Sequence, residues 1–555
     1  MVDEHRDSPS EPRLSNVSTN SRVASLLLYL IPPLLSAGLL ILAFPRYNLG
    51  WLGWVALVPL LSAISGRNAR YGFVQAFLCG MIFFVLAFDW VFEASGYTLL
   101  HHLLLCAYMG LYFGLFGALF SLLCKRPGVR IALLAAPFIW VFLEYIRSNM
   151  GFMALPYAWL GYTQHAYPLV IQIASVAGAY GVSFLLAMVN SAVTAFLLAL
   201  FYRSRNFNTR PNRPISNRGL VGIVATAAFF VIFTLCYGMI VVSKPTVGKK
   251  IEVSVVQGNI EQAKKWDRRY RNYILERYEE LSREASKDQP TLIIWPEAAT
   301  PGFVLSDFPL KKRFTELVQE INTYFLIGSS EYPKLQKPPL GVGQVGNTAL
   351  FFSPDGKVMG QYLKIHLLPF AEYVPYQKLI PWPQFIVPEG RKVFEAPGSE
   401  MTLFDLQGAK FGVLICWENI FPGLFRSFVK EGAHFMVNIT NEAWFGRSVG
   451  PQHYVISSVF RAVENRVYVI RCANTGISCF IDPYGRVVDR VKDDKGQDIF
   501  VRGVLTETVI PMESRTVYTR YGDWLVWICF GVSLIFVSFA FSRRKAQADT
   551  PTEHL

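Results

Sequence analysis

Charged residues are scarce in this chain of 555 residues. They make up 17% of the sequence against 52% hydrophobic residues, whereas soluble domains have about 25% charged residues. This balance argues against a purely soluble protein and favours a membrane protein. The scarcity is uneven, which divides the chain into polar tails at 1–22 and 543–555, a bundle of apolar runs at 23–243, a globular domain at 244–522 and a last apolar run at 523–542.

Several motifs of cofactor-dependent and hydrolytic sites are also missing. No group of residues has the spacing of metal ligands, and His101-His102 lies in an apolar run without carboxylate partners. Gly341-Val342-Gly343 is not followed by Lys-Ser/Thr and a helix, so it does not predict a phosphate loop. A Gly-x-Ser-x-Gly elbow is absent as well. We therefore expect no metal and no cofactor.

Eight apolar stretches are candidates for membrane-spanning helices, because crossing a bilayer takes roughly 20 apolar residues. They lie at about 24–44, 50–65, 71–92, 98–123, 131–148, 179–201, 219–243 and 524–542. The second is the weakest candidate, since it is short and contains Pro59. Segment 166–178 is apolar but interrupted by Gln172 and Gly178, which suits a re-entrant or interfacial piece better than a span.

The net charge of +13 is concentrated in short loops on one side of these spans. Arginine and lysine occur in 1–22, 66–70, 124–130, 202–218 and 543–545, whereas the opposite loops 93–97 and 149–178 have none. Basic loops stay on the cytoplasmic side, so we expect both termini inside and residues 244–522 outside. The first 22 residues are polar and no small-residue cleavage site follows, so we expect the first span to be retained. Charge in this location argues against a nucleic-acid partner.

Cysteines separate into two groups. Five of the eight lie in or beside the spans, where a small hydrophobic residue is the ordinary interpretation, and Cys416, Cys472 and Cys479 lie in the globular domain. An odd number in an oxidising compartment leaves at least one thiol free. We expect Cys416 to be that thiol; whether Cys472 and Cys479 pair stays open.

The globular domain alternates predicted strands and helices, which indicates an α/β layered sandwich. Predicted strands are 251–256, 291–295, 324–328, 346–352, 411–415, 434–438, 467–472, 477–481 and 499–505. Predicted helices are 268–286, 308–322, 420–430 and 453–464.

Three chemically active side chains stand at the ends of apolar, strand-like segments. Cys416 ends Phe411–Ile415, Glu297 follows Thr291–Trp295 and Pro296, and Lys364 follows Gln361-Tyr362-Leu363. A thiol becomes a nucleophile only as a thiolate, and a partly desolvated glutamate can take its proton. A nearby lysine would stabilise the thiolate and then a tetrahedral oxyanion.

Other residues near these strand ends are candidates for supporting roles. Glu372, between Phe370-Ala371 and Tyr373-Val374, is a candidate ion-pair partner of Lys364. Glu418 is either a second active-site carboxylate or a helix cap. Trp266 and Trp417 are candidates for contact with an apolar substrate. We expect Asn347 and Asn441 to be structural.

The motifs Trp295-Pro296-Glu297, Tyr362-Leu363-Lys364 and Cys416-Trp417-Glu418 together resemble the Glu-Lys-Cys triad of the nitrilase (carbon–nitrogen hydrolase) superfamily. The flanking spans, Gln257–Ile260, Lys265-Trp266, Pro369–Pro375 and Tyr518–Asp523 are similar to its membrane branch, the apolipoprotein N-acyltransferases. Trp417 stands where many relatives have tyrosine, which bears on specificity more than on catalysis.

This resemblance implies an αββα sandwich on a helical membrane bundle. It implies that Cys416 takes an acyl chain from a membrane phospholipid as a thioester. The α-amino group of a diacylglyceryl-cysteine at a lipoprotein's N-terminus would then receive the chain, in the bacterial inner membrane with the catalytic domain in the periplasm. A thioester relay divides one difficult transfer into two easier steps.

Two other classes of protein remain open at this point. A membrane-anchored amidase would share the triad but would not need so many spans. A transporter or scaffold with an inactive domain should carry charged residues along a path through its spans, and here Asp89, Glu93, Glu144 and Arg147 lie near their ends.

Overall fold

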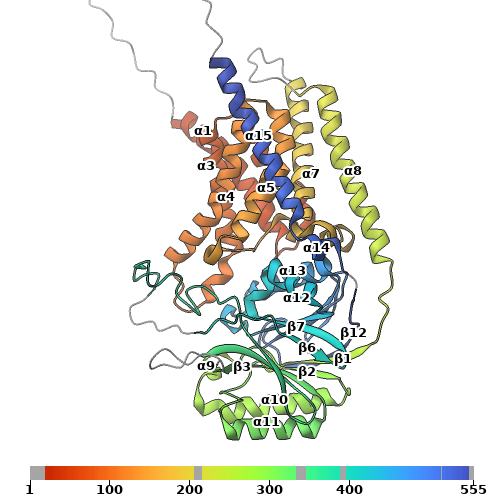
Figure 1. Ribbon diagram of the computed structural model, residues 1–555. Coiled ribbons are helices and arrows are strands. Elements are labelled where there is room, and N and C mark those ends of the chain that lie inside the picture. Colours follow the sequence, from red (N-terminus) through yellow and green to blue (C-terminus); the bar gives the residue numbers. More distant parts are fainter. Residues whose placement is uncertain (1–18, 205–214, 333–344, 388–394, 514, 549–555) are drawn as a thin grey trace, which may run out of the picture.

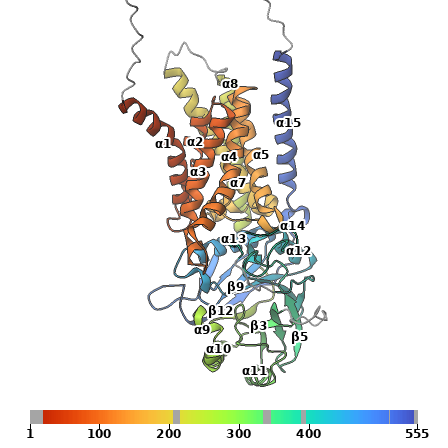
Figure 2. The same cartoon turned by 90° about the vertical axis from the view of Figure 1, so that its left-hand side faces the viewer.

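A computed structural model describes residues 19–204, 215–332, 345–387, 395–513 and 515–548. It has a helical bundle that stands on one α/β domain (Figure 1). The described chain begins and ends at the end of the bundle far from the α/β domain (Figures 1 and 2). The chain therefore enters the α/β domain from the bundle and returns to the bundle after it.

The bundle is built from long apolar helices in the first half of the chain and one at its end. These are α1 (Thr19–Ala43), α3 (Ala69–Ala87), α4 (Leu99–Lys125), α5 (Val129–Ser148), α7 (Ala174–Ser204), α8 (Asn217–Val242) and α15 (Trp524–Ala548). Within the described residues, the six from α3 onward are long and apolar enough to cross a membrane. The chain is thus a multi-pass membrane protein.

The two remaining predicted spans correspond to shorter apolar helices, Tyr29–Ala43 and Gly50–Ile64. The second is divided into η1 (Gly50–Trp54) and α2 (Val58–Ile64), with Pro59 in the first turn of α2. Proline suits a first turn but not a helix interior, which explains the break. The prediction of about eight spans is therefore approximate.

The far end of the bundle gathers the basic loops. Arg126 donates to the carbonyl of Ala540 at 3.5 Å and covers the ring of Phe541. Arg130 lies against Gly219 at the start of α8. These contacts bring the predicted cytoplasmic loop 124–130 to the end of α15 and to the start of α8.

The α/β domain has two facing six-stranded sheets, in the orders β12-β1-β2-β3-β4-β5 and β11-β10-β9-β8-β7-β6. The strands are β1 (Ile251–Gln257), β2 (Leu292–Ile294), β3 (Tyr324–Glu331), β4 (Gly346–Phe352), β5 (Val358–Leu363), β6 (Leu403–Leu406), β7 (Ala409–Ile415), β8 (Phe435–Thr440), β9 (Tyr468–Ala473), β10 (Cys479–Ile481), β11 (Val487–Arg490) and β12 (Gly503–Val509). Helices α10 (Arg271–Ser286) and α11 (Phe308–Ile321) cover the first sheet, and α12 (Pro422–Glu431) and α13 (Gly450–Asn465) lie between the second sheet and the bundle (Figure 1). This confirms the predicted αββα sandwich on a membrane bundle.

The last predicted strand, 499–505, overlaps β12 only at 503–505, and β6 and β11 were not predicted. Of β5, only the strand-like end Gln361–Leu363 before Lys364 was predicted. Residues 499–502 precede β12 as a loop, in which Phe500 has φ +54° and donates its N–H to the carbonyl of Thr475. That long-range bond removes Phe500 from the sheet. Cys472 and Cys479 are both free thiols, so the disulfide left open by the sequence is not formed.

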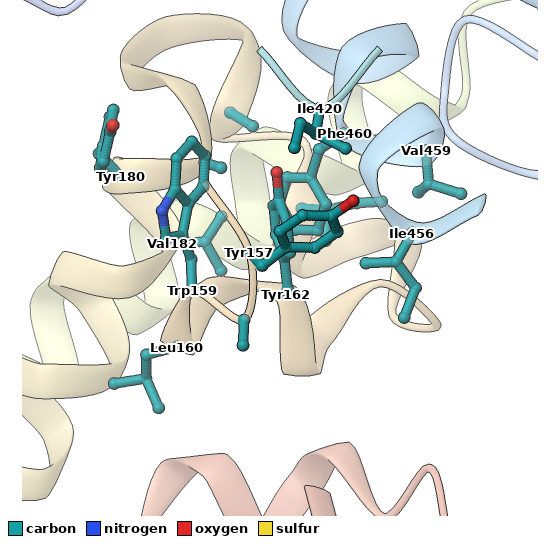
Figure 3. Close-up of a cluster of buried hydrophobic side chains, with 14 of the residues drawn as sticks. Tyr157, Trp159, Leu160, Tyr162, Tyr180, Val182, Ile420, Ile456, Val459 and Phe460 are labelled. Atoms are coloured by element: carbon teal, nitrogen blue, oxygen red, sulfur yellow. The ribbon is translucent and has the colours of Figure 1, made fainter. Parts of the chain in front are cut away.

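An aromatic cluster joins the bundle to the α/β domain. Figure 3 shows Tyr157, Trp159 and Tyr162 from the segment between α5 and α7 packed beside Ile420 and Phe460. Segment 166–178 belongs to this junction, because it contains the short helix α6 (Pro168–Ile171) and a break at Gly178, which has φ +67°. Residues 166–173 lie outside the candidate spans, whereas 174–178 form the first turn of the helix that contains one, so the predicted re-entrant or interfacial role stays a prediction.

The junction also has buried polar contacts. The Glu464 carboxylate on α13 pairs with Arg461 at 2.8 Å and accepts the N–H of Ala179 at 2.9 Å. Arg466 donates to the side chain of Gln172 at 2.6 Å. Such contacts fix the bundle's orientation on the second sheet, where the candidate site lies.

Candidate active site

Cys416 stands at the sharp turn between β7 and the short helix η6 (Cys416–Ile420). Its φ of +56° lies in the left-handed region, which side chains other than glycine rarely adopt. Asn438 on the neighbouring strand β8 donates its amide to the carbonyl oxygens of Leu414 and Cys416 at 3.0 and 3.1 Å. These two bonds stabilise the strained backbone at Cys416. The half-buried thiol lies beyond the end of β7.

Glu297 follows β2 and is held at both carboxylate oxygens. Oε1 accepts from the Asn347 amide at 2.7 Å, and Oε2 accepts the backbone N–H of Asn441 at 2.8 Å. β3 packs closely against the backbone at Glu297, which places the carboxylate for these two bonds. A Cβ on Gly328 would lie 2.7 Å from both the Glu297 Cα and the Ala298 nitrogen, so only glycine fits there.

Lys364 follows β5 and is fully buried, with 0% of its side chain exposed. Its Nζ lies 2.5 Å from the Glu372 carboxylate and 3.8 Å from that of Glu297. Burial alone would lower the lysine pKa, but Glu372, the Cys416 sulfur and Glu297 outweigh it, and the pKa of Lys364 is raised. The ammonium stays charged inside the site.

These side chains act on one another electrostatically. Burial raises the pKa of the Cys416 thiol well above its usual range, the negative charge of Glu297 raises it further, and Lys364 opposes both. A resting thiol beside a carboxylate and a fixed ammonium has a proton acceptor and a counter-ion within the same pocket. This arrangement suits attack on a carbonyl carbon with stabilisation of the resulting oxyanion.

Glu418 is buried and bonded to the backbone on both sides of the site. It accepts N–H groups from Ile415 at 2.8 Å, Ile365 at 2.8 Å and His366 at 2.9 Å, and the Tyr362 hydroxyl at 2.9 Å. It ties the end of β7 to the end of β5, the two strands that carry Cys416 and Lys364. A helix cap accounts only for the bond from Ile415. Glu418 also bonds to backbone N–H groups that follow a strand of the other sheet.

A cavity of about 490 Å³ lies between the bundle and the α/β domain beside these residues. Residues from the end of α5 and the following loop line one side, and residues that follow β5 and β7 line the other. Trp417 lines it, with its indole N–H bonded to the carbonyl of His366 at 2.6 Å. Glu395 and Pro397 also line it, while the residues just before them, 388–394, lie outside the described part of the chain.

Trp266 is not among the residues that line this cavity, and it is 61% exposed at the end of α9 (Gln262–Lys265). Its neighbour Lys265 is buried instead and donates Nζ to the backbone carbonyl of Glu297 at 2.8 Å. Burial lowers the pKa of Lys265 to about 8, against the attraction of Glu297 and Cys416.

Sequence reasoning missed Lys265 and Glu395 and assigned Asn347 and Asn441 to structure alone. Asn347 begins the predicted strand 346–352, where an amide before an apolar run was a usable signal. Asn441 contributes a backbone N–H, which no side-chain pattern can indicate. Glu395 lies outside every predicted strand and helix, and no sequence pattern marks it.

The comparisons with known proteins agree with this architecture. Residues 36–192 match the family described as "Apolipoprotein N-acyltransferase N-terminal domain", and residues 252–510 match "Carbon-nitrogen hydrolase". The apolipoprotein N-acyltransferase of Geobacter metallireducens is 35% identical over 520 residues, which cover 92% of this chain and 95% of that protein. The chain belongs to the apolipoprotein N-acyltransferase family.

Similarity to this family extends through the bundle as well as the α/β domain. The apolipoprotein N-acyltransferase of Chlorobaculum tepidum is 31% identical over 540 residues, covering 92% of this chain and 96% of that protein. Saccharomyces cerevisiae Nit3, a member of branch 10 of the nitrilase superfamily, is 20% identical over 56% of this chain and 100% of its own, with a TM-score of 0.35. The family matches and the curated relatives show that the chain is an enzyme of the carbon–nitrogen hydrolase superfamily, and the amidase alternative is less supported.

Proposed function

We propose that this enzyme transfers an acyl chain from a membrane phospholipid to the α-amino group of the diacylglyceryl-cysteine at a lipoprotein's N-terminus. Cys416 is the nucleophile, Glu297 the base and Lys364 the oxyanion partner. Glu372 holds Lys364, and Glu418 holds the two strand ends together. The observation that carries the proposal is the meeting of Glu297, Lys364 and Cys416 beside a cavity that the bundle and the α/β domain share.

In the first step, Glu297 takes the Sγ proton and the sulfur attacks the ester carbonyl of the phospholipid. The carbonyl oxygen becomes an oxyanion that faces the Lys364 ammonium. Its collapse breaks the ester bond, and the leaving lysophospholipid oxygen takes the proton from Glu297. The products are a lysophospholipid and a thioester on Cys416.

In the second step, the α-amino group attacks the thioester carbonyl through the same oxyanion geometry. The amine loses a proton to Glu297, the carbon–sulfur bond breaks, and Glu297 returns the proton to the leaving sulfur, so that an amide and the Cys416 thiol result. Trp417 offers an apolar wall for the acyl chain. The exposed Trp266 would contact a substrate only outside the described cavity, as a surface contact for an arriving lipid.

The distribution of basic residues indicates on which side of the membrane the reaction takes place. The basic loops gather at the far end of the bundle, which supports a cytoplasmic location for that end. The α/β domain then lies in the periplasm of the bacterial inner membrane, next to both lipid substrates. No group of three or more potential metal ligands occurs in the part of the chain described here, and the proposed steps use none.

Mass analysis of the protein extracted from membranes tests this proposal against an amidase. A fraction of the peptide that contains Cys416 should carry a fatty acyl group, which hydroxylamine removes as expected for a thioester. An amidase would carry no fatty acyl adduct, so an unmodified Cys416 in protein purified with its native lipids contradicts the proposal.

A further inference from the structure

The cavity beside Cys416 has one charged side chain among its described lining residues, Glu395. The other polar residues of the lining are neutral: Ser148 and Asn149 from the bundle, and His366 and Tyr373 from the α/β domain. Burial lowers the pKa of His366, so its ring is uncharged near neutral pH. A mostly apolar cavity with a single carboxylate on its wall suits a ligand that is apolar over most of its surface and cationic at one point.

Glu395 also lacks a partner for its charge. Its Oε2 is shielded from solvent without a hydrogen-bond partner, and within the described residues no ion pair reaches its carboxylate. Glu372, by contrast, bonds to Lys364 and to the N–H of Leu368 at 2.7 Å. A buried carboxyl group without a partner takes up a proton instead of ionising, and a cationic ligand would make its ionised form favourable.

The surrounding charges favour a cation. The Lys364 ammonium already forms ion pairs with two carboxylates, Glu372 at 2.5 Å and Glu297 at 3.8 Å. Burial raises the pKa of Glu395 to about 8, and the negative charges of Glu372 and Glu297 raise it while Lys364 lowers it. Glu395 is therefore largely protonated near neutral pH in the empty cavity, and a bound ammonium group would lower its pKa and ionise it.

Glu395 is fixed next to the catalytic residues by its backbone. The N–H of Glu395 donates to the carbonyl of Glu372 at 3.3 Å. The N–H of Gly398 donates to the carbonyl of Lys364 at 2.7 Å. The next residue, Ala396, bonds to Val345 at 3.0 Å. The carboxylate therefore has a defined place on the cavity wall.

We propose that Glu395 is the counter-ion for a primary ammonium group of a lipid substrate bound in the cavity. This inference rests on the proposed function, which supplies two sources of that group: an ethanolamine headgroup on the donor phospholipid and the α-ammonium of the acceptor. The shared chemistry is a small cation joined to acyl chains. Glu395 thereby determines which substrate is accepted and takes no part in the acyl transfer itself.

The test uses the full-length protein in detergent with three variants. Glu395→Gln keeps the shape and removes the charge, and Glu395→Asp keeps the charge. Glu400→Gln removes an exposed carboxylate from the same loop and serves as the control. Acyl-enzyme formation is measured from phosphatidylethanolamine and, separately, from phosphatidylglycerol, which has no ammonium. Discharge of the acyl-enzyme is then measured against the concentration of a diacylated peptide with a free α-amino group.

A charge-assisted contact of this kind is worth roughly tenfold in binding. If the donor's ammonium is bound, Glu395→Gln should lose about tenfold with phosphatidylethanolamine and little with phosphatidylglycerol. If the α-ammonium of the acceptor is bound, the KM for the peptide should rise about tenfold. The rates of acyl-enzyme formation from both lipids should then stay unchanged. Glu395→Asp should keep most of either preference, and Glu400→Gln should match the wild type.

Equal losses with both donors and an unchanged peptide KM would overturn the inference, and so would Glu395→Gln behaving like Glu400→Gln. The thermal unfolding midpoint of each variant excludes a folding defect as the cause of a loss. Failure of the proposed function is a different result, since the wild type would then form no acyl-enzyme from either lipid.

Discussion

At the scale of single residues, the site holds its nucleophile as a protonated thiol. Burial and Glu297 both raise the pKa of Cys416, and Lys364 only partly opposes them. A thiol in this state resists adventitious oxidation and alkylation, because both reactions need the thiolate. In the proposed mechanism, proton transfer to Glu297 accompanies the approach of the ester, which links reactivity to substrate binding.

Replacing Cys416 tests the nucleophile. Cys416→Ala should abolish both the acyl-enzyme and transfer. Cys416→Ser should fail too, because a glutamate that ionises a thiol of ordinary pKa about 8.5 cannot ionise an alcohol. Transfer is measured by a gel-mobility or mass shift of a diacylated peptide, and near-normal transfer by Cys416→Ala would refute the mechanism.

Lys364 and Glu297 have separable roles in the proposed steps. Lys364→Ala should lose at least the 10²–10³-fold in rate that a missing oxyanion donor costs. Lys364→Arg should not restore it, since a planar fork cannot replace a compact ammonium between Glu372 and Glu297. Glu297→Gln keeps the shape and loses the base. Native rates of Cys416 acylation in either variant, followed by stopped-time mass analysis, would mean that the roles are misassigned.

At the scale of elements, the site depends on strand ends from two sheets. β2 and β5 of one sheet carry Glu297 and Lys364, while β7 of the other carries Cys416. Glu418 connects the ends of β5 and β7 through backbone N–H groups. The sandwich therefore brings together three residues that are far apart in the sequence.

Gly328 on β3 tests how closely these elements must pack. Gly328→Ala would push the backbone at Glu297 away, since the added Cβ would lie 2.7 Å from the Glu297 Cα. We expect acyl-enzyme formation to fall by about 10²-fold, the effect of a misplacement near 1 Å. Gly423→Ala is the matched control in α12, where the added Cβ meets nothing within 4 Å. Equal rates for the two variants would argue against tight positioning of Glu297.

The sequence predicted these elements where a local pattern of apolar residues determines the structure. It missed them where contacts between distant residues determine it. Apolar runs such as 411–415 and 346–352 identify buried strands by themselves, and so place Cys416 at the end of β7. Phe500 lies outside β12 because of a bond to Thr475, which no local pattern records. Glu395 was missed for the same reason, since its proposed role depends on a cavity lined by residues from the bundle and from the segments that follow β5 and β7. Trp266 was selected as an aromatic in a charged stretch, while its neighbour Lys265 lies inside the site.

At the scale of the whole molecule, the two ends of the bundle differ in charge and in what they contact. One end meets the α/β domain through an aromatic junction that includes Trp159 and Phe460 (Figure 3). The other gathers basic residues such as Arg126 and Arg130 beside the ends of α15 and α8. The cavity lies at the first end, and the proposed function requires its lipid substrates to enter there from the bilayer.

Reporter fusions test this orientation. A reporter fused after residue 218 should be active only if it works in the cytoplasm, because the loop before α8 lies at the basic end. One fused near residue 300 should be active only if it works in the periplasm. The opposite pair of results would contradict the proposed topology.

The order of the two half-reactions tests the central claim most directly. Purified full-length protein is mixed with phospholipid alone, and lysophospholipid release and the mass of the Cys416 peptide are followed before a diacylated peptide is added. We predict one lysophospholipid released for each acylated Cys416, and then loss of the acyl group as the triacylated peptide forms. An acyl-enzyme that forms only when the peptide is already bound, or a triacylated peptide that forms without any acyl-Cys416, would contradict the account.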